Sequence, residues 1–364
     1  MKKIIFKIII LMTISIIISF SNENAGTKKE NIQLSENEKL QVFDMRYLTS
    51  ENGEYLNVIL EENSKSVFVD YIFYTNQSIN ALIFDTEINE GYIKAEAVNY
   101  NETTIEGNLS DSGFSGKIEG REVNFVNSKS PLSGAKVVRY TYTNISPTSA
   151  SEEDKKIFEY YSSIFLFNND KKSAIIDKIN LDINSEITSE KLYINKLSDI
   201  KNILSNNMLP FYNDWRPDEG EYGYNYYSIS EYGIDYLSEK IVSINKYFYE
   251  YEGGAHGVHG KIYKVYSLSN GERLKIEDIL IDVNDLDLLN KVKEKLLSIA
   301  DEESYFNLDE LSLQENNFYI TSKGLMFTWG IYEIAPYAMG DFEVLFSIDE
   351  IMPYLKDEYK SIFE

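Results

Sequence analysis

The chain has 364 residues, of which 43% are hydrophobic, and it contains no cysteine. This length provides enough apolar material for a folded core and suggests two or three domains, while the absence of cysteine excludes disulfides, thiol catalysis and cysteine-bound zinc. The 35 basic and 59 acidic residues give a formal net charge of −24, which disfavours nucleic acid and anionic membranes as partners and favours cationic ones.

The first 21 residues have the pattern of an export signal. Lys2, Lys3 and Lys7 surround the start of an apolar run, "IIILMTISIII", and small residues follow it at Ser19 and Ser21. We predict cleavage after Ser21 and a mature protein that is periplasmic or extracellular, with no later membrane span; retention of the run as an anchor is the alternative. Removal of the three lysines leaves 32 basic and 59 acidic residues, a net charge of −27.

Short alternating runs follow a polar leader at residues 22–39, which we expect to be flexible. The runs recur about every ten residues and are separated by Asn, Gly, Ser or Asp, as in antiparallel strands joined by tight turns. They read "LQVFDMRYL", "EYLNVILE", "SVFVDYIFYT", "INALIFDTE", "YIKAEAVNY", "TTIEGNL" and "FSGKIEG". We therefore predict a small antiparallel β-meander domain at residues 40–127.

Helical spacing of apolar residues appears after residue 151. A linker at residues 128–151 contains one predicted strand, "AKVVRYTYT". Helices are then predicted at residues 172–187, 189–209 and 284–300. We expect Pro210 and Pro217 to end the second helix and Asn284 to cap the third.

Strand patterns alternate with these helices. They occur in "YGYNYYSIS", "KIVSINKYFYEY" and "KIYKVYSLS", in the hairpin "NFYITSKGLMFTW" and in "FEVLFSI", which precedes a short helix from Asp349. The order does not repeat strand–helix–strand units, so we predict an α+β fold with antiparallel sheets and packed helices. Its two parts are a companion domain at residues 135–251 and a C-terminal domain at residues 252–364.

Both histidines of the chain lie in "YEYEGGAHGVHGK", at His256 and His259. Two histidines and a carboxylate can bind a catalytic zinc, but Gly253, Gly254 and Gly257 disfavour a helix, and in a strand this spacing points the rings to opposite faces. We therefore predict a tight turn in which His256 bonds to backbone and matters for folding, while His259 is nearly neutral. No cofactor or catalytic residue is expected; a metal-assisted cell-wall hydrolase using both histidines is the alternative.

Tyrosines form the other conspicuous pattern. Strand alternation places Tyr247, Tyr249 and Tyr251 on one face, where they could bind a sugar or a protein or simply pack the sheet against a helix. The loop "IYEIAPYAMG" is a second candidate surface. The candidate binding residues beyond the three tyrosines are Trp215, Tyr332, Glu333, Pro336 and Tyr337.

Two stretches carry a family resemblance. "YEYEGGAHGVHGKIYKVYSLSNGERLKIEDIL" (residues 249–280) resembles a Y-x-x-GGAHG motif followed by a strand and a turn, and "FYITSKGLMFTWGIYEIAPYAMGDFEVLFSIDEI" (residues 318–351) resembles the Y-E-I-A-P-Y-A-x-G end of the same family. The family that these stretches resemble is the C-terminal domain of unknown function shared by the lysozyme-sensing anti-sigma factor RsiV and the peptidoglycan deacetylase PdaC. The resemblance extends over residues 135–355.

The resemblance implies an exported, non-catalytic domain pair, which binds lysozyme in RsiV. Only seven residues precede Ile8, leaving no room for a sigma-binding segment, and no deacetylase domain is present, so neither of those activities is expected. The sequence thus predicts an extracytoplasmic cell-envelope binding protein rather than an enzyme. Its expected partner is lysozyme, another cationic envelope protein or peptidoglycan.

Overall fold

The computed structural model describes residues 35–74, 79–100, 103–132, 134–145, 156–169, 171–215, 224–315 and 317–363. The predicted signal, the leader up to residue 34 and Pro217 lie outside the described residues. Within these ranges, no helix is both long and apolar enough to cross a membrane.

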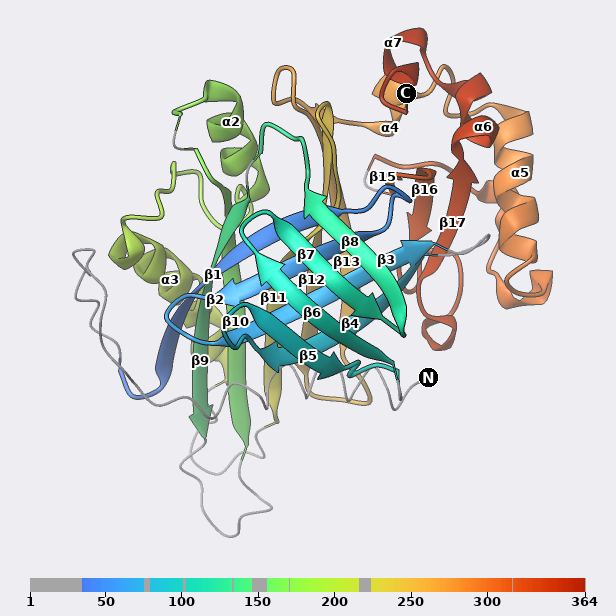
Figure 1. Cartoon of the computed structure of the whole chain (residues 1–364). Helices are drawn as coiled ribbons and strands as arrows, with labels where there is room; N and C mark the ends of the chain where they lie inside the picture. The colour runs from blue at the N-terminus through green and yellow to red at the C-terminus, as the bar shows by residue number, and fades with distance from the viewer. Residues whose placement is uncertain are drawn as a thin grey trace.

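The predicted meander is a ring of eight antiparallel strands (Figure 1). Consecutive strands pair from β1 to β4 and from β5 to β8; a bridge between Phe84 and Ala97 links β4 to β5, and the pairs Leu48–Asn127 and Thr49–Val126 link β8 back to β1. The strands are β1 (Glu38–Thr49), β2 (Tyr55–Glu61), β3 (Ser66–Tyr74), β4 (Ile79–Glu87), β5 (Tyr92–Glu96), β6 (Thr104–Ser110), β7 (Gly113–Ile118) and β8 (Arg121–Asn127). The last of them was not predicted, although it closes the ring.

A side-chain amide completes the seam between β4 and β5. The Asn99 Nδ2 donates to the Ala81 carbonyl at 2.7 Å, and its Oδ1 accepts from the Ile83 N–H at 2.9 Å. The Val98 N–H also donates to the Ile83 carbonyl at 2.8 Å. Asn99 therefore supplies the donor and acceptor that a neighbouring peptide group would otherwise provide.

The N-terminal half of β1 joins the ring to a second group of strands. It pairs with β9 over eight residues, and the order continues β14-β13-β12-β11-β10-β9-β1. These strands are β9 (Ala135–Ile145), β10 (Ile157–Phe167), β11 (Tyr226–Leu237), β12 (Ile241–Glu252), β13 (Val258–Ser267) and β14 (Arg273–Leu274). The predicted α+β fold with antiparallel sheets is confirmed, with β10–β11 as a parallel pair. Strand β10 was missed.

Two helices cover this part of the sheet. Helix α2 (Ala174–Ile183) forms where the isoleucine spacing predicts it, whereas α3 (Leu197–Trp215) begins later than expected and runs through Pro210. Pro210 is exposed, so the helical carbonyl that lacks a partner can bond to water. The predicted stop at Pro210 was therefore wrong.

The C-terminal residues form a small three-stranded sheet covered by helices (Figure 1). Its strands are β15 (Phe318–Thr321), β16 (Gly324–Trp329) and β17 (Phe342–Ser347), and the helices are α4 (Ile276–Ile279), α5 (Leu286–Leu297), α6 (Ile348–Ile351) and α7 (Asp357–Lys360). The cap of α5 is Asp285 and not Asn284, because the Asp285 carboxylate accepts from the Asp287 and Leu288 N–H groups. The hairpin and the short helix agree with the prediction.

The eight-stranded ring packs with its outer face on the sheet formed by β9–β14, which we call the large sheet. Alternation along β2 turns Leu56 and Val58 into the ring and Tyr55 outward, where it joins a core that includes Phe165 and Ile244. The Asn57 Nδ2 donates to the Ile234 carbonyl across this contact at 2.8 Å. The large sheet also continues across the expected 251/252 boundary, which lies in the β12–β13 hairpin.

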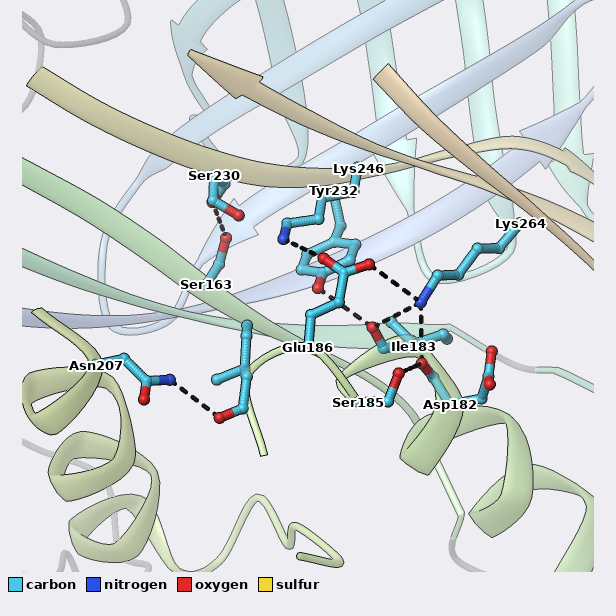
Figure 2. Close-up of polar contacts among 11 residues, drawn as sticks. Ser163, Asp182, Ile183, Ser185, Glu186, Asn207, Ser230, Tyr232, Lys246 and Lys264 are labelled. Atoms are coloured by element: carbon cyan, nitrogen blue, oxygen red, sulfur yellow. Dashed lines mark hydrogen bonds and ion pairs between the residues drawn. The ribbon is translucent and has the colours of Figure 1, made fainter. Parts of the chain in front are cut away.

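Lys264 links the C-terminal end of α2 to the sheet, and it is only 7% exposed. Its ammonium donates to the Asp182 carbonyl at 3.0 Å and lies 3.8 Å from the Glu186 carboxylate, which Lys246 also contacts at 2.7 Å (Figure 2). Burial lowers the pKa of Lys264, while the nearby Asp182 and Glu186 charges oppose that change. A cation at this helix end also faces the negative end of the helix dipole, so the cluster has a structural role.

Candidate functional site

The glycine-rich stretch is the turn between β12 and β13, as predicted. Gly253 and Gly254 have φ angles of +86° and +91°, which other residues rarely adopt. Gly257 is needed for a different reason: a Cβ there would lie 2.6 Å from the Glu250 carbonyl oxygen and 2.6 Å from the Tyr249 ring. The backbone therefore approaches its neighbours too closely for a side chain.

The turn meets the "IYEIAPYAMG" loop through aromatic contacts. The His256 ring stacks on Tyr337 with centroids 3.9 Å apart, and the His259 ring meets Tyr337 edge-on at 5.9 Å. The Tyr332 ring also lies near Tyr337, with centroids 5.7 Å apart. His259 Nε2 also lies 3.9 Å from an Asp341 oxygen. We call these five residues the motif-loop face.

The two histidines differ from expectation in their burial. His256 is exposed, and its Nδ1 lies 3.1 Å from the Gly257 carbonyl oxygen, to which it donates a hydrogen bond only in the tautomer with the proton on Nδ1. His259 is the more buried of the two, with a side chain that is 22% exposed and lies opposite Tyr249. The ring that we expected to be nearly neutral is therefore the more buried of the two.

The loop residues project toward solvent. Tyr332 has a φ of +66° and is 53% exposed, and Glu333 and Pro336 are exposed as well. A non-glycine residue held at positive φ is strained, and such residues cluster at binding and switch sites. The Asn317 Nδ2 donates to the Glu333 Oε2 at 2.8 Å, which orients this carboxylate. Val258 and Met339, next to the face in sequence, are also exposed.

The three predicted tyrosines lie on β12, the strand that leads into the glycine-rich turn. Pairing sets Tyr247 opposite Lys261 and Tyr249 opposite His259, and all three tyrosines are partly buried. On the neighbouring strand, Tyr227 lies 6.1 Å from Tyr251 between ring centres. The face thus continues onto the sheet as a row of rings with polar tips.

Trp215 was wrongly predicted as a surface residue. It is 3% exposed and packs against Phe158 and Tyr212 beneath α3, while its Nε1 donates to the Tyr224 carbonyl at 2.7 Å. Its position at the end of an amphipathic helix turns the indole toward the sheet. Trp215 therefore belongs to a core and not to the motif-loop face.

Three aspartates from distant parts of the chain each interact electrostatically with Lys261. We call these three aspartates and Lys261 the acidic junction. Burial, with a smaller contribution from Glu231, raises the pKa of Asp70 on β3 to about 7, against the opposing effect of Lys261. Burial also raises the pKa of Asp235 on β11 to about 7, against the effects of Lys261 and a 2.8 Å bond from Asn245. Burial raises the pKa of Asp341 too, opposed by His259 and Lys261.

The acidic junction was not predicted from the sequence. Asp70 lies between Phe68 and Ile72, which face outward from the ring into the contact with the large sheet. Asp235 lies at a register shift in β11, and its Oδ2 has no hydrogen-bond partner among the described residues. A charged residue on the outer face of an otherwise apolar strand was the available signal. Across the described ranges, no group of three or more His, Asp or Glu side chains is arranged for a metal ion.

One segment of the chain matches a known protein family. Residues 277–349 match the family model described as "Protein of unknown function (DUF3298)". The matched segment includes the "IYEIAPYAMG" loop, while the glycine-rich turn precedes it in the chain. No curated protein matches the sequence.

Two solved structures of DUF3298 proteins resemble the chain. One, from Bacteroides fragilis NCTC 9343, has 19% sequence identity and a TM-score of 0.45, with coverage of 60% of this chain and 92% of that chain. The other, from Pseudomonas aeruginosa PAO1, has 16% identity and a TM-score of 0.40, with coverage of 61% and 94%.

Proposed function

We propose that this protein is an exported, non-catalytic binding protein of the cell envelope that captures a cationic protein with its motif-loop face. A lysozyme is the first candidate partner, because the sequence resembles the domain pair of a lysozyme sensor. The observation that carries the proposal is the contact of Tyr337 with both His256 and His259, which joins two motifs separated by about 80 residues into one exposed surface.

The charge of this surface supports a basic partner. Within residues 249–261 and 330–341 there are four carboxylates and a single lysine; Glu250, Glu252 and Glu333 are exposed, and Asp341 is partly exposed. The net charge of −24 extends the negative field beyond the contact area. Long-range attraction speeds the encounter of opposite charges, and desolvated aromatic rings then prolong the complex. Tyr332 and Tyr337 are suited to that second task.

Binding kinetics test the proposal. The chain without residues 1–21 is immobilised and exposed to a hen-type lysozyme, to an unrelated basic protein of similar size and to a neutral protein. We expect lysozyme binding whose association slows with added salt more than its dissociation accelerates. Equal binding of both basic proteins would reduce the effect to net charge, and no lysozyme binding at low salt would contradict the partner. N-terminal sequencing of the secreted protein checks its export.

A further inference from the structure

A pocket of about 330 Å³ adjoins the motif-loop face. One wall comes from the segment after α5, with Phe306, Asn307, Glu310 and Gln314, and the other comes from the end of β16 and the loop after it, with Trp329 and Glu333. The Phe306 N–H donates to the Ile334 carbonyl at 2.9 Å, which ties the two walls together. The volume is at the lower end for small-ligand sites and suits a single side chain.

The polar groups of the pocket are those that a cation needs. Glu310 and Glu333 supply carboxylates, Asn307 and Gln314 supply amides, and no basic residue is among the described lining residues. The adjoining segment, residues 301–310, contains five carboxylates and no basic residue. Lys293 contacts two of them, Asp309 at 2.6 Å and Glu302 at 4.0 Å, but neither carboxylate lines the pocket. The pocket is thus strongly acidic.

An exposed ring accompanies these carboxylates. Phe306 lines the pocket yet is 57% exposed, and the Trp329 indole lies in the opposite wall. A planar guanidinium can stack on such a ring while its N–H groups bond to carboxylates in a fork, which an ammonium cannot do as well. Glu333 is already oriented by the amide of Asn317, so less ordering is required when a ligand binds.

We propose that this pocket binds the guanidinium group of an arginine side chain on a basic protein partner. The inference rests on the proposed function, because Glu333 follows Tyr332 directly and so connects the pocket to the motif-loop face. A partner that covers the tyrosines would bring its own surface across the pocket. The face would then supply contact area, and the pocket would select arginine over lysine.

A peptide titration tests the pocket without any partner protein. The chain contains two tryptophans, and Trp215 lies in a separate core, so their indole N–H signals in NMR spectra report two different places. The probes are acetyl-Gly-Arg-Gly-amide, its lysine counterpart, and the citrulline counterpart, which keeps the shape but lacks the charge. Trp215→Phe and Trp329→Phe each remove one signal and so assign both. We expect the arginine peptide to shift the Trp329 signal only, and the lysine and citrulline peptides to bind more weakly.

Charge-removing variants complete the experiment. Glu333→Gln and Glu310→Gln should each weaken binding of the arginine peptide by about 5- to 10-fold. Glu303→Gln is the matched control, because Glu303 is exposed in the same acidic segment but does not line the pocket, and it should change binding by less than about twofold. Equal binding of the citrulline peptide, or an equal loss in Glu303→Gln, would overturn the inference.

The outcome also separates the inference from the function on which it rests. Lysozyme binding without any response to the arginine peptide would refute the pocket and leave the motif-loop face as the binding surface. A selective response to the peptide, with no basic protein bound, would support the pocket and refute the proposed partner.

Discussion

Asp70 and Asp235 retain protons at pH values where most carboxyl groups are charged, because burial raises the pKa of each to about 7 from 3.8. The native protein therefore binds more protons than the unfolded chain between about pH 4 and pH 7. The stabilisation is complete below the unfolded pKa and is lost as the pH rises through 7. We expect the free energy of unfolding to fall across this window.

Asp70→Asn tests this expectation, since the amide remains neutral at every pH. Its free energy of unfolding should exceed that of the wild type at pH 8 by about 1–3 kcal/mol, with little difference at pH 4. Asp111→Asn is the control, because Asp111 is fully exposed beside Arg46. Urea unfolding at several pH values gives the comparison. Parallel curves for the wild type and Asp70→Asn would show that Asp70 titrates normally.

The two histidines should differ in their effect on stability. His259→Ala removes a partly buried ring that contacts Tyr337 and lies near Asp341, and it should cost about 1–2 kcal/mol. His256→Ala removes an exposed ring and should cost less than about 1 kcal/mol. Denaturant unfolding measures both. Zinc bound in equal molar amount, and lost in both variants while folding stays intact, would instead support the hydrolase alternative.

Local chemistry made some residues predictable and others not. Gly253 and Gly254 have positive φ angles, which glycine readily adopts, so the turn could be predicted from the sequence. The environment of Asp70 exists only because the ring of strands packs on the large sheet, and the contact of His256 with Tyr337 joins residues 81 positions apart. Neither can follow from neighbouring residues. The same holds for the burial of Trp215.

Helix α2 and its C-cap residue Asn184 take the place of a neighbouring strand beside β10. The Asn184 Nδ2 donates to the Phe165 carbonyl at 2.7 Å, and its Oδ1 accepts from the Phe165 N–H at 3.1 Å. One helical turn earlier, Asn180 makes the same pair of bonds with Phe167. These amides cover β10 beyond its short parallel pairing with β11, where Ser163 Oγ also donates to the Ser230 carbonyl at 2.7 Å (Figure 2).

Removal of one amide should therefore destabilise the protein strongly. Asn184 is 1% exposed, so Asn184→Ala leaves a buried N–H and a buried carbonyl of Phe165 without partners. We expect a loss of about 2–4 kcal/mol in the free energy of unfolding. Asn202→Ala on the exposed side of α3 is the control and should change it by less than about 0.5 kcal/mol. Similar losses in the two variants would show that the Asn184 amide does not stabilise β10.

The burial of each element explains whether it could be predicted from the sequence. The meander strands alternate because one side faces the ring interior, and most of them were predicted. Strand β10, "IFEYYSSIFLF", is buried on both faces and has no alternation, so its period was not recognised. Helix α3 continues past Pro210 because that position faces solvent, which the residue type alone does not indicate.

Strand β1 belongs to both the ring and the large sheet. It supplies Phe43 and Met45 to the core beneath β9, and its loss would leave β9 with an unpaired edge. We expect a fragment of residues 135–364 to be much less stable than residues 35–364 or to aggregate. Size-exclusion chromatography and thermal unfolding of the two chains check this. Equal stability would mean that the C-terminal part folds without the ring.

We expect the motif-loop face to bind a basic protein, and paired tyrosine variants are the sharpest test of this claim. Tyr332 and Tyr100 are 53% and 54% exposed. Alanine therefore removes a comparable aromatic side chain from the motif-loop face in one case and from the segment after β5 in the other. Lysozyme affinity should fall at least about tenfold for Tyr332→Ala and change by less than about twofold for Tyr100→Ala. Equal effects of the two variants, or no effect of Tyr332→Ala, would contradict the claim.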